Sequence, residues 1–256
     1  MSRSFIKSMG KLVIPSGVRP LLRRRWLKIK HAGIRHQCCC CGSFLRGFLP
    51  HGNPPAPNFL CPVCRSKPPH RLAALMFDRH PEWFRSGGLL VHIAPEAQLR
   101  IRLLQKAQDC GMRYRCGGIT GCGDEFLDLL NLPFADGSVD LLYCCHVLNS
   151  LQNDKAAMKE VHRVMKPDGV ALLQVPAFHK GTTTLETNSL KERLSVFQDE
   201  GIFRCYTDAD YVERLSSVGF RVDHLWAEHL SGKLVLRHEL KKEVLHVCRR
   251  NDGLHS

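Results

Sequence analysis

The chain has 256 residues, of which 44% are hydrophobic, and it carries a formal net charge of +13. That length suits one domain of ordinary size with a small accessory module. No apolar run reaches the roughly 18–20 residues that a membrane helix needs, and the N-terminus lacks the apolar stretch of a secretory signal. We therefore expect a cytoplasmic protein that neither spans a membrane nor is secreted.

The first 37 residues form a basic arm that contains no acidic residue. The arm carries ten Lys and Arg residues, so most of the net charge lies here. Such an arm can bind nucleic acid or an anionic membrane surface, can direct the chain to an organelle, or can be a solvated tail. Composition leaves these alternatives open, and we treat residues 1–37 as a separate segment.

Residues 38–71 are rich in Cys, Gly and Pro and contain two cysteine pairs of equal spacing. The pairs, separated by 19 residues, are Cys38 with Cys41 and Cys61 with Cys64. Each C-x2-C pair can place two thiolates on one tight turn, and two such turns complete a four-cysteine zinc site. We expect a structural zinc ion that folds a segment too short to build its own core.

The other cysteines leave one ambiguity in this zinc site. The chain has 13 Cys in all, and without a secretory signal a disulfide framework is not expected. Residues 38 to 41 are all Cys. The outer two have the usual spacing, but Cys39 or Cys40 could take the place of either one.

From about residue 72 onward, short apolar runs alternate with helical patterns. This alternation is typical of a mostly parallel sheet covered by helices on both faces. The pattern predicts strands over residues 89–93, 112–116, 126–130, 139–145, 169–175, 220–226 and 244–248. It predicts helices over residues 72–77, 96–108, 154–165 and 208–218. We therefore expect one α/β domain over residues 72–256, built on a seven-stranded sheet.

One segment of this domain carries a specific pattern. Residues 132–176 read LPFADGSVDLLYCCHVLNSLQNDKAAMKEVHRVMKPDGVALLQVP. The order Leu-Pro-Phe, acidic turn, Val-Asp, apolar strand, His-Val-Leu and a helix ending in Lys-Pro-Asp-Gly resembles class I, type 11-like S-adenosylmethionine-dependent methyltransferases between their fourth and fifth strands. The resemblance implies a Rossmann-like fold that binds S-adenosylmethionine and transfers its methyl group.

Two further segments are similar to one subgroup of these methyltransferases. They are CPVCRSKPPHRL (61–72) and LVHIAPEAQL (90–99). The subgroup has an N-terminal zinc-knuckle module and His-x-Ala-Pro-Glu in place of the usual glycine-rich first motif. With them, the resemblance extends over nearly all of the chain after residue 37.

The resemblance also implies where the cofactor lies, across the carboxyl ends of the strands at the switch in strand order. Its implied cofactor-contacting residues are His92, Ala94, Glu96, Asp128, Leu129 and Cys145. Asp128 would accept a hydrogen bond from the adenine amino group, and capping its own turn is the alternative. His146 is a candidate general base for a hydroxyl acceptor, and a packed histidine is the alternative.

Two positions depart from the family pattern. Gly118 stands where an acidic residue usually holds the ribose, and residues 198–202 lack the Gly-Gln and Asp-His elements of the subgroup. We therefore keep three hypotheses. The first is an active methyltransferase for a small-molecule, glycan or lipid acceptor. The second is a catalytically silent fold that binds a partner through the zinc module and the basic arm. The third is a nucleic-acid methyltransferase, which the charge favours but the scarcity of aromatic residues in the arm does not.

Overall fold

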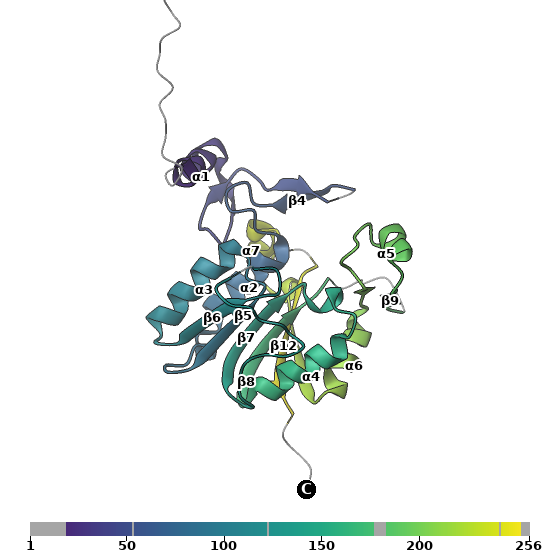
Figure 1. Ribbon diagram of the computed structural model, residues 1–256. Coiled ribbons are helices and arrows are strands. Elements are labelled where there is room, and N and C mark those ends of the chain that lie inside the picture. Colours follow the sequence, from purple (N-terminus) through teal and green to yellow (C-terminus); the bar gives the residue numbers. More distant parts are fainter. Residues whose placement is uncertain (1–18, 53, 122, 177–182, 241, 252–256) are drawn as a thin grey trace, which may run out of the picture.

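The centre of the fold is a sheet in the order β11-β12-β8-β7-β5-β6 (Figure 1). The computed structural model describes residues 19–52, 54–121, 123–176, 183–240 and 242–251, and within them this sheet has six strands. The strands are β5 (Leu89–Ile93), β6 (Arg113–Gly117), β7 (Val139–Cys145), β8 (Met165–Gln174), β11 (Phe220–Trp226) and β12 (Val244–Arg250). Strands β5 to β8 are mutually parallel, and β12 lies antiparallel between β8 and β11.

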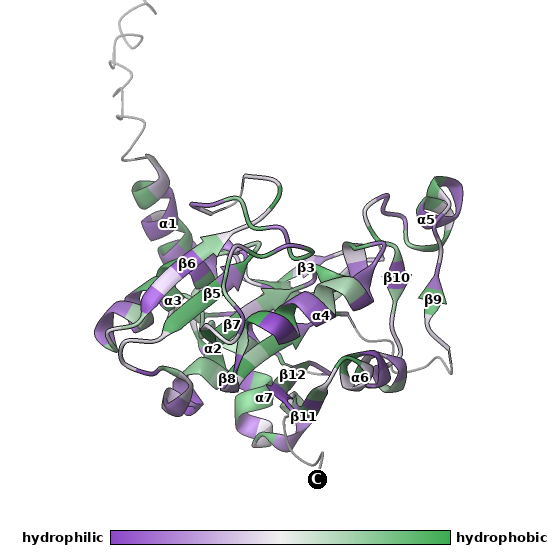
Figure 2. Ribbon diagram, turned by 60° about the horizontal axis from the view of Figure 1, so that its bottom comes forward, coloured by the Kyte–Doolittle hydropathy of each residue, from purple (hydrophilic) through white to green (hydrophobic). Residues whose placement is uncertain are grey.

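Helices cover both faces of this sheet. The first face carries α2 (Pro68–Arg79) and α3 (Ala97–Asp109), and the second carries α4 (Asp154–Val164) and α6 (Asp208–Ser217). Along β5, Leu90 packs into the core under α2 and α3, whereas Val91 packs into the core under α4 and α6. Successive strand residues face opposite sides, so a strand buried on both faces reads as a continuous apolar run. Figure 2 shows the hydrophobic central strands. The fold is the predicted α/β Rossmann-like class, with a mixed and mostly parallel sheet.

The strand expected over residues 126–130 is wrong. In its place, Gly117 makes one isolated parallel bridge with Glu125. Phe126 is 72% exposed, so this segment lacks the alternating burial that would hold it as an edge strand. A Cβ on Gly117 would lie 2.0 Å from the carbonyl oxygen of Glu125, so the chain returns to β6 closely enough to require glycine there.

The boundary between α4 and β8 also differs from the expected one. The helix ends at Val164 and the strand begins directly at Met165, before the residues expected to form a loop. A register shift between Val139 and Leu141 accommodates the extra residues of β8 in its pairing with β7. By contrast, β5, β7 and β11 have the predicted bounds.

An N-terminal module lies at one end of the sheet, above α3 and α7 (Figure 1). Its elements are α1 (Arg19–Lys30), β1 (Ala32–Gln37), β2 (Phe44–Leu45), β3 (Leu49–His51) and β4 (Ala56–Leu60). Strands β1 and β2 pair antiparallel, as do β3 and β4. Helix α1 was not predicted, and the part of the basic arm before residue 19 lies outside the described residues. None of the described helices combines the length and the apolar character needed to cross a membrane.

A segment between β8 and α6 forms an insertion over the loop that follows β7. It contains β9 (Leu185–Glu186), α5 (Leu190–Val196) and β10 (Arg204–Cys205). Arg204 is 1% exposed and donates hydrogen bonds to the carbonyl oxygens of Leu151 and Gln152 and to the carboxylate of Glu186. Tyr206 donates from its hydroxyl to Asp154 over 2.8 Å. These buried bonds fix the insertion to the loop between β7 and α4.

Arg71 of α2 joins the N-terminal module to the sheet domain. Its side chain is fully buried. The guanidinium donates to carbonyl oxygens of the module at Phe59 (2.9 Å) and Ser66 (3.0 Å). It also donates to His238 (2.7 Å) and Glu239 (3.1 Å), at the end of α7 (Gly232–His238). One side chain therefore supplies the donors for backbone groups from two distant parts of the sequence.

Candidate functional site

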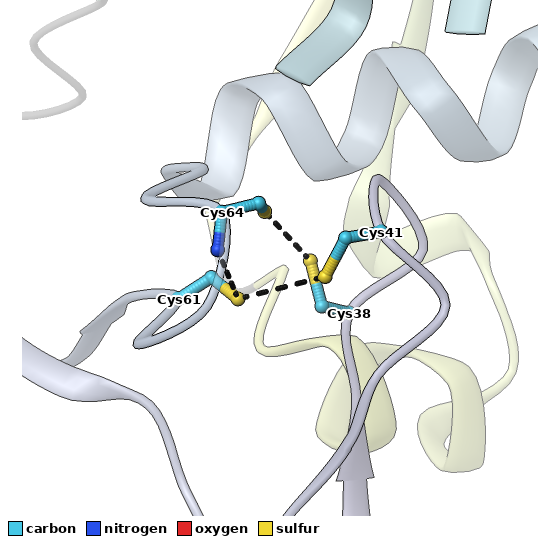
Figure 3. Close-up of side chains that lie close together, drawn as sticks. All are labelled: Cys38, Cys41, Cys61 and Cys64. Carbon is cyan, nitrogen blue, oxygen red and sulfur yellow. Dashed lines mark hydrogen bonds between the residues drawn. The ribbon is translucent and has the colours of Figure 1, made fainter. Parts of the chain in front are cut away.

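Four cysteine side chains of the N-terminal module converge on one point. The sulfur atoms of Cys38, Cys41, Cys61 and Cys64 all lie within 4.8 Å of one another. The Cys38–Cys64 distance is 3.6 Å and the Cys41–Cys61 distance is 3.9 Å (Figure 3). In a tetrahedral zinc site with Zn–S bonds of about 2.3 Å, neighbouring sulfurs lie about 3.8 Å apart. The cluster therefore has the dimensions of a four-thiolate zinc site.

The two cysteine pairs lie on equivalent turns. After the first pair, the N–H of Gly42 donates to the carbonyl of Cys38 over 2.7 Å. After the second, the N–H of Arg65 donates to the carbonyl of Cys61 over 2.9 Å. Both donors have positive φ, 70° at Gly42 and 62° at Arg65. Each turn therefore directs its two thiols to the same side, as the spacing predicts.

The two inner cysteines of the 38–41 run are not members of this cluster. The thiol of Cys39 donates to the carbonyl of Arg71 over 3.0 Å, and that of Cys40 donates to the carbonyl of His70 over 3.3 Å. Both therefore contact the backbone of α2. The outer pair, with the usual spacing, forms the cluster, and the described cysteines are all free of disulfides.

The cluster lies beside the buried charge of Arg71. Burial lowers the pKa of this guanidinium, and negative charge on neighbouring cysteines, first on Cys38, opposes that shift. Among the described residues Arg71 forms no ion pair with a carboxylate. A buried cation needs a compensating charge, and four thiolates around a divalent ion carry a net negative charge. The position of Arg71 therefore fits a metal-loaded cluster.

A second constellation lies at the carboxyl ends of the strands, where Glu96 sits between two histidines. Glu96 Oε2 is 3.0 Å from Nε2 of His92, and Oε1 is 3.5 Å from Nε2 of His70. The other ring nitrogen of His92 lies 2.9 Å from the hydroxyl of Tyr114. That of His70 lies 2.6 Å from the side-chain amide of Gln98. Because hydroxyl and amide groups can donate to Nδ1, both histidines can present N–H at Nε2 to the carboxylate.

This arrangement keeps Glu96 charged. Burial disfavours the carboxylate, but the hydrogen bond from His92 and the nearby His70 outweigh it, so the pKa of Glu96 is lowered overall. The thiol of Cys145, at the end of β7, lies within 4.8 Å of the ligand atoms of His70 and Glu96. Burial raises the pKa of Cys145, so this neighbour is a neutral thiol. The edge of the sheet thus presents one buried negative charge.

Two residues at this edge adopt left-handed backbone conformations that glycine usually takes. Ala94, directly after β5, has a φ of 47°, and His146, directly after β7, has a φ of 58°. Their N–H groups donate to Gly117 and Gln174, each over 2.7 Å, which holds both residues against neighbouring strands. Such conformations cost of order 1–3 kcal/mol and concentrate at functional sites. The sequence analysis named both as candidate site residues, Ala94 for the cofactor and His146 as a general base.

His146 is held in its neutral form. Burial, assisted by His70 and Lys67, lowers the pKa of His146 to about 4. The imidazole therefore keeps a free lone pair throughout the neutral range. It can accept a proton, but only from a group that has become strongly acidic.

The residues expected to contact the adenine and the ribose make other interactions in the structure. Asp128 is half-buried, and its Oδ1 accepts the N–H of Leu130 over 2.9 Å, so Asp128 caps its own turn. Leu129 is buried in the core under α4 and α6. After β6, both nearby acids are paired with arginines, Asp124 with Arg100 and Glu125 with Arg115. Among the described residues, Asp128 makes no hydrogen bond or ion pair with the Glu96 cluster.

A cavity of about 660 Å³ lies beside this edge, between the N-terminal module and α3. Its walls include Arg24 of α1, Cys64 of the cysteine cluster, and Gln98, Ile101 and Lys106 of α3. It does not lie between Glu96 and Asp128.

Sequence reasoning missed two residues of this edge, His70 and Asn149. His70 reaches Glu96 from α2, 26 residues earlier in the sequence. Asn149 is 3% exposed, and its side-chain oxygen has no hydrogen-bond partner among the described residues. The N–H of Phe203, in the insertion, donates to the backbone oxygen of Asn149 over 2.9 Å. A polar residue shortly after a strand that is apolar except for Asp140 was the available signal for Asn149.

One family model matches the chain, over residues 87–173, and is described as a methyltransferase domain. The match runs from just before β5 into β8, so it contains Glu96, Asp128 and His146. Together with the strand order, it shows a Rossmann-like methyltransferase fold. No curated protein matches the chain significantly.

Solved structures of low sequence identity also match. The chain is 12% identical to an S-adenosylmethionine-dependent methyltransferase from Archaeoglobus fulgidus, with a TM-score of 0.48 over 73% of this chain and 96% of that one. It is 13% identical to phosphoethanolamine N-methyltransferase 2 of Haemonchus contortus in complex with S-adenosyl-L-methionine, with a TM-score of 0.46 over 69% and 51%. It is 15% identical to the [4+2]-cyclase SpnF, with a TM-score of 0.45 over 92% and 94%.

The lowered pKa of His146 gives a pH prediction. A histidine with a folded pKa of about 4, below its ordinary value of 6.5, favours folding above pH 6.5 and loses that contribution as the pH falls through 4. We expect the imidazole carbon resonances of His146 to titrate near pH 4 in the folded chain. The His146→Gln variant identifies these resonances. A midpoint near 6.5 would contradict the burial described here.

Proposed function

We propose that this chain binds S-adenosylmethionine at the carboxyl edge of the sheet and methylates a small-molecule, glycan or lipid acceptor, because residues 87–173 match a model of a methyltransferase domain. One observation carries the proposal, the charged Glu96 at the start of α3, whose side chain is only 17% exposed. S-adenosylmethionine presents two cationic groups, an ammonium and a sulfonium. A buried carboxylate that retains its charge is the partner that a buried cation requires.

Orphaned polar atoms at the same edge support a missing ligand. The hydroxyl of Tyr143 and the side-chain oxygen of Asn149 are buried and lack hydrogen-bond partners among the described residues. Leaving such a group unsatisfied costs about 1–3 kcal/mol each. Asn149 lies four residues beyond the end of β7, where a ligand can supply its missing bond. Tyr143 lies within β7 and packs against Phe77 in the core under α2 and α3.

We assign the cofactor to the positions that the resemblance implies. His92 would orient Glu96 through the 3.0 Å contact at its Nε2, and Ala94 would bring its backbone close to the ligand. Asp128 would use its second oxygen for the adenine amino group, since Oδ1 already caps the turn. Leu129 would pack beside the adenine, and Cys145 would face the cationic end of the ligand.

On this proposal, few steps of the reaction depend on protein side chains. When bound, S-adenosylmethionine supplies an activated methyl group, so the protein mainly orients the acceptor and excludes water. His146 is proposed to take the proton of a hydroxyl acceptor. Its pKa of about 4 makes it a weak base, which suits an oxygen that becomes strongly acidic as it gains the methyl group. Asn149 is proposed to accept a hydrogen bond from the acceptor beneath the insertion.

We further propose that the four-cysteine cluster holds a structural zinc ion. Its sulfur–sulfur distances of 3.6 and 3.9 Å and the buried charge of Arg71 support the ion. Four thiolates leave no open coordination position, so the ion would not take part in catalysis. On this proposal residues 38–71 are a zinc-binding module between the basic arm (1–37) and the methyltransferase domain (72–256). The arm would contact an anionic surface.

One observation favours the second hypothesis, a silent fold that binds a partner. The acids that follow β6 are paired with arginines, and Gly118 occupies the ribose position, so the usual carboxylate for the ribose hydroxyls is absent there. The Asp124–Arg100 pair is exposed and screened by solvent, so Asp124 can exchange partners. Binding of the cofactor separates the two hypotheses.

The role of Glu96 predicts the effect of one isosteric change. Calorimetric titration of the zinc-loaded chain with S-adenosylmethionine is expected to show binding, and Glu96→Gln is expected to weaken it roughly tenfold or more because the compensating charge is lost. The matched control is Glu82→Gln, since Glu82 also pairs with a histidine but is exposed. An absence of binding at millimolar cofactor would remove the enzyme hypothesis. Equal affinities of wild type and Glu96→Gln would remove only the role of Glu96.

The zinc proposal predicts different outcomes for neighbouring cysteines. After dialysis against a chelator, wild type and Cys39→Ser are expected to retain about one zinc ion per chain, because Cys39 faces α2. Cys64→Ser is expected to lose the ion and to unfold at a lower temperature. Elemental analysis and thermal unfolding measure both. Equal zinc loss in the two variants would contradict the assignment of the cluster.

A further inference from the structure

Three side chains from separate elements meet beside strands β11 and β12, away from the cysteine cluster. They are Asp208 at the start of α6, His224 in β11 and His246 in β12. One ligand atom from each lies within 4.8 Å of the other two. His246 Nε2 is 2.8 Å from Asp208 Oδ1, and His224 Nε2 is 3.2 Å from Asp208 Oδ2. Both imidazoles therefore turn the same nitrogen toward one carboxylate.

The position of the two histidines is set by strand register. His224 and His246 are directly opposite partners in the antiparallel β11–β12 pair, and directly opposite residues project on the same face. Their ring centroids are 5.0 Å apart. Trp226 stacks on His224 at 5.8 Å and 9°, and Tyr211 packs edge-on against His246 at 4.8 Å. Packing on both sides therefore holds the rings in place without any bound ion.

Two ring nitrogens of the group have no hydrogen-bond partner among the described residues, Nε2 of His224 and Nδ1 of His246. The Nε2 of His224 is buried and remains without a hydrogen bond, although the carboxylate of Asp208 is close. Buried ring nitrogens normally have a partner. This nitrogen faces the space that it shares with the carboxylate and with His246, where an ion bound to all three would use it.

The group is open to solvent on one side. The side chain of His246 is fully buried, whereas those of His224 and Asp208 are 25% and 29% exposed. An ion can therefore enter from solvent, and water can complete its coordination.

We propose that Asp208, His224 and His246 form a second metal site, which binds a divalent transition-metal ion of the zinc, cobalt and nickel class. Imidazole ligands favour these ions, whereas magnesium and calcium favour all-oxygen sites. Three protein ligands leave a coordination position for water, unlike the closed four-thiolate cluster. The site depends on no feature of the cysteine cluster or of the proposed methyl-transfer site.

Occupancy of this site would join the start of α6 to the last two strands. Thr207 caps α6 directly before Asp208. The N–H of Thr207 donates to the hydroxyl of Thr184, in the insertion, over 3.0 Å. The ion would therefore fix the point at which the insertion meets the sheet. Because it binds the folded chain, it would also raise the thermal midpoint with its concentration.

Trp226 supplies a direct readout of the site, because it stacks on one proposed ligand. The full chain is first dialysed against a chelator, so that only the cysteine cluster keeps its zinc ion. Addition of nickel chloride is then expected to quench tryptophan fluorescence with saturation at about one equivalent and a dissociation constant in the micromolar range. Trp83→Phe is expected to keep this response, and Trp226→Phe is expected to lose it. His224→Gln and Asp208→Asn are each expected to weaken binding roughly tenfold or more.

The matched control is His80→Gln. His80 also stacks on a tryptophan, Trp83, at 4.3 Å and lies 2.7 Å from a carboxylate, but it lacks a second histidine. This variant is expected to bind nickel as wild type does. The thermal midpoint checks that each variant is folded, and nickel is expected to raise it in wild type but not in His224→Gln. An absence of quenching up to millimolar nickel, or equal affinities of His224→Gln and wild type, would overturn the proposal.

Discussion

The fold depends on how one buried positive charge is accommodated. Arg71 is fully buried, forms no carboxylate pair among the described residues, and donates to four carbonyl oxygens. Two of these oxygens belong to the N-terminal module and two to the end of α7. A buried guanidinium is tolerated only when its hydrogen bonds and its charge are both satisfied. The carbonyls satisfy the hydrogen bonds, and the proposed zinc–thiolate cluster would supply the opposite charge. Arg71 therefore links the module, α2 and the end of α7 through one buried side chain.

The contacts of Arg71 also affect the proposed cofactor site, through the preceding residue, His70. Because α2 is fixed at its first turn, His70 is fixed as well, and its Nε2 lies 3.5 Å from the carboxylate of Glu96. His92 approaches the same carboxylate from β5. The lowered pKa of Glu96 thus depends on a residue of the sheet and on a residue positioned by the cysteine module. On this account the module is a part of the site's electrostatics, although its own metal ion would perform no chemistry.

The sequence predicted those features whose information is local. Apolar runs bounded by turn residues placed β5, β7 and β11 at their observed bounds, and equal cysteine spacing identified the cluster that the structure shows. The third strand was wrong because an apolar pattern around Phe126 cannot reveal that the chain folds back onto Gly117. The pairing of Glu96 with two histidines and the cluster of Asp208 with His224 and His246 could not be predicted, since each joins residues from separate elements. Strand register and helix docking bring them together, and both are set by packing across the whole domain.

The linkage of the N-terminal module, α2 and α7 through Arg71 is tested most directly by the free energy of unfolding of one variant. Arg71→Met keeps the buried volume but removes the charge and all the donors to four carbonyls, and urea unfolding of the zinc-loaded chain is predicted to show a loss of about 3–5 kcal/mol. Arg85→Met removes an exposed arginine that pairs with Asp168, and it is predicted to cost less than about 1 kcal/mol. If the two variants unfold with the same free energy, the structure does not depend on the buried charge as described.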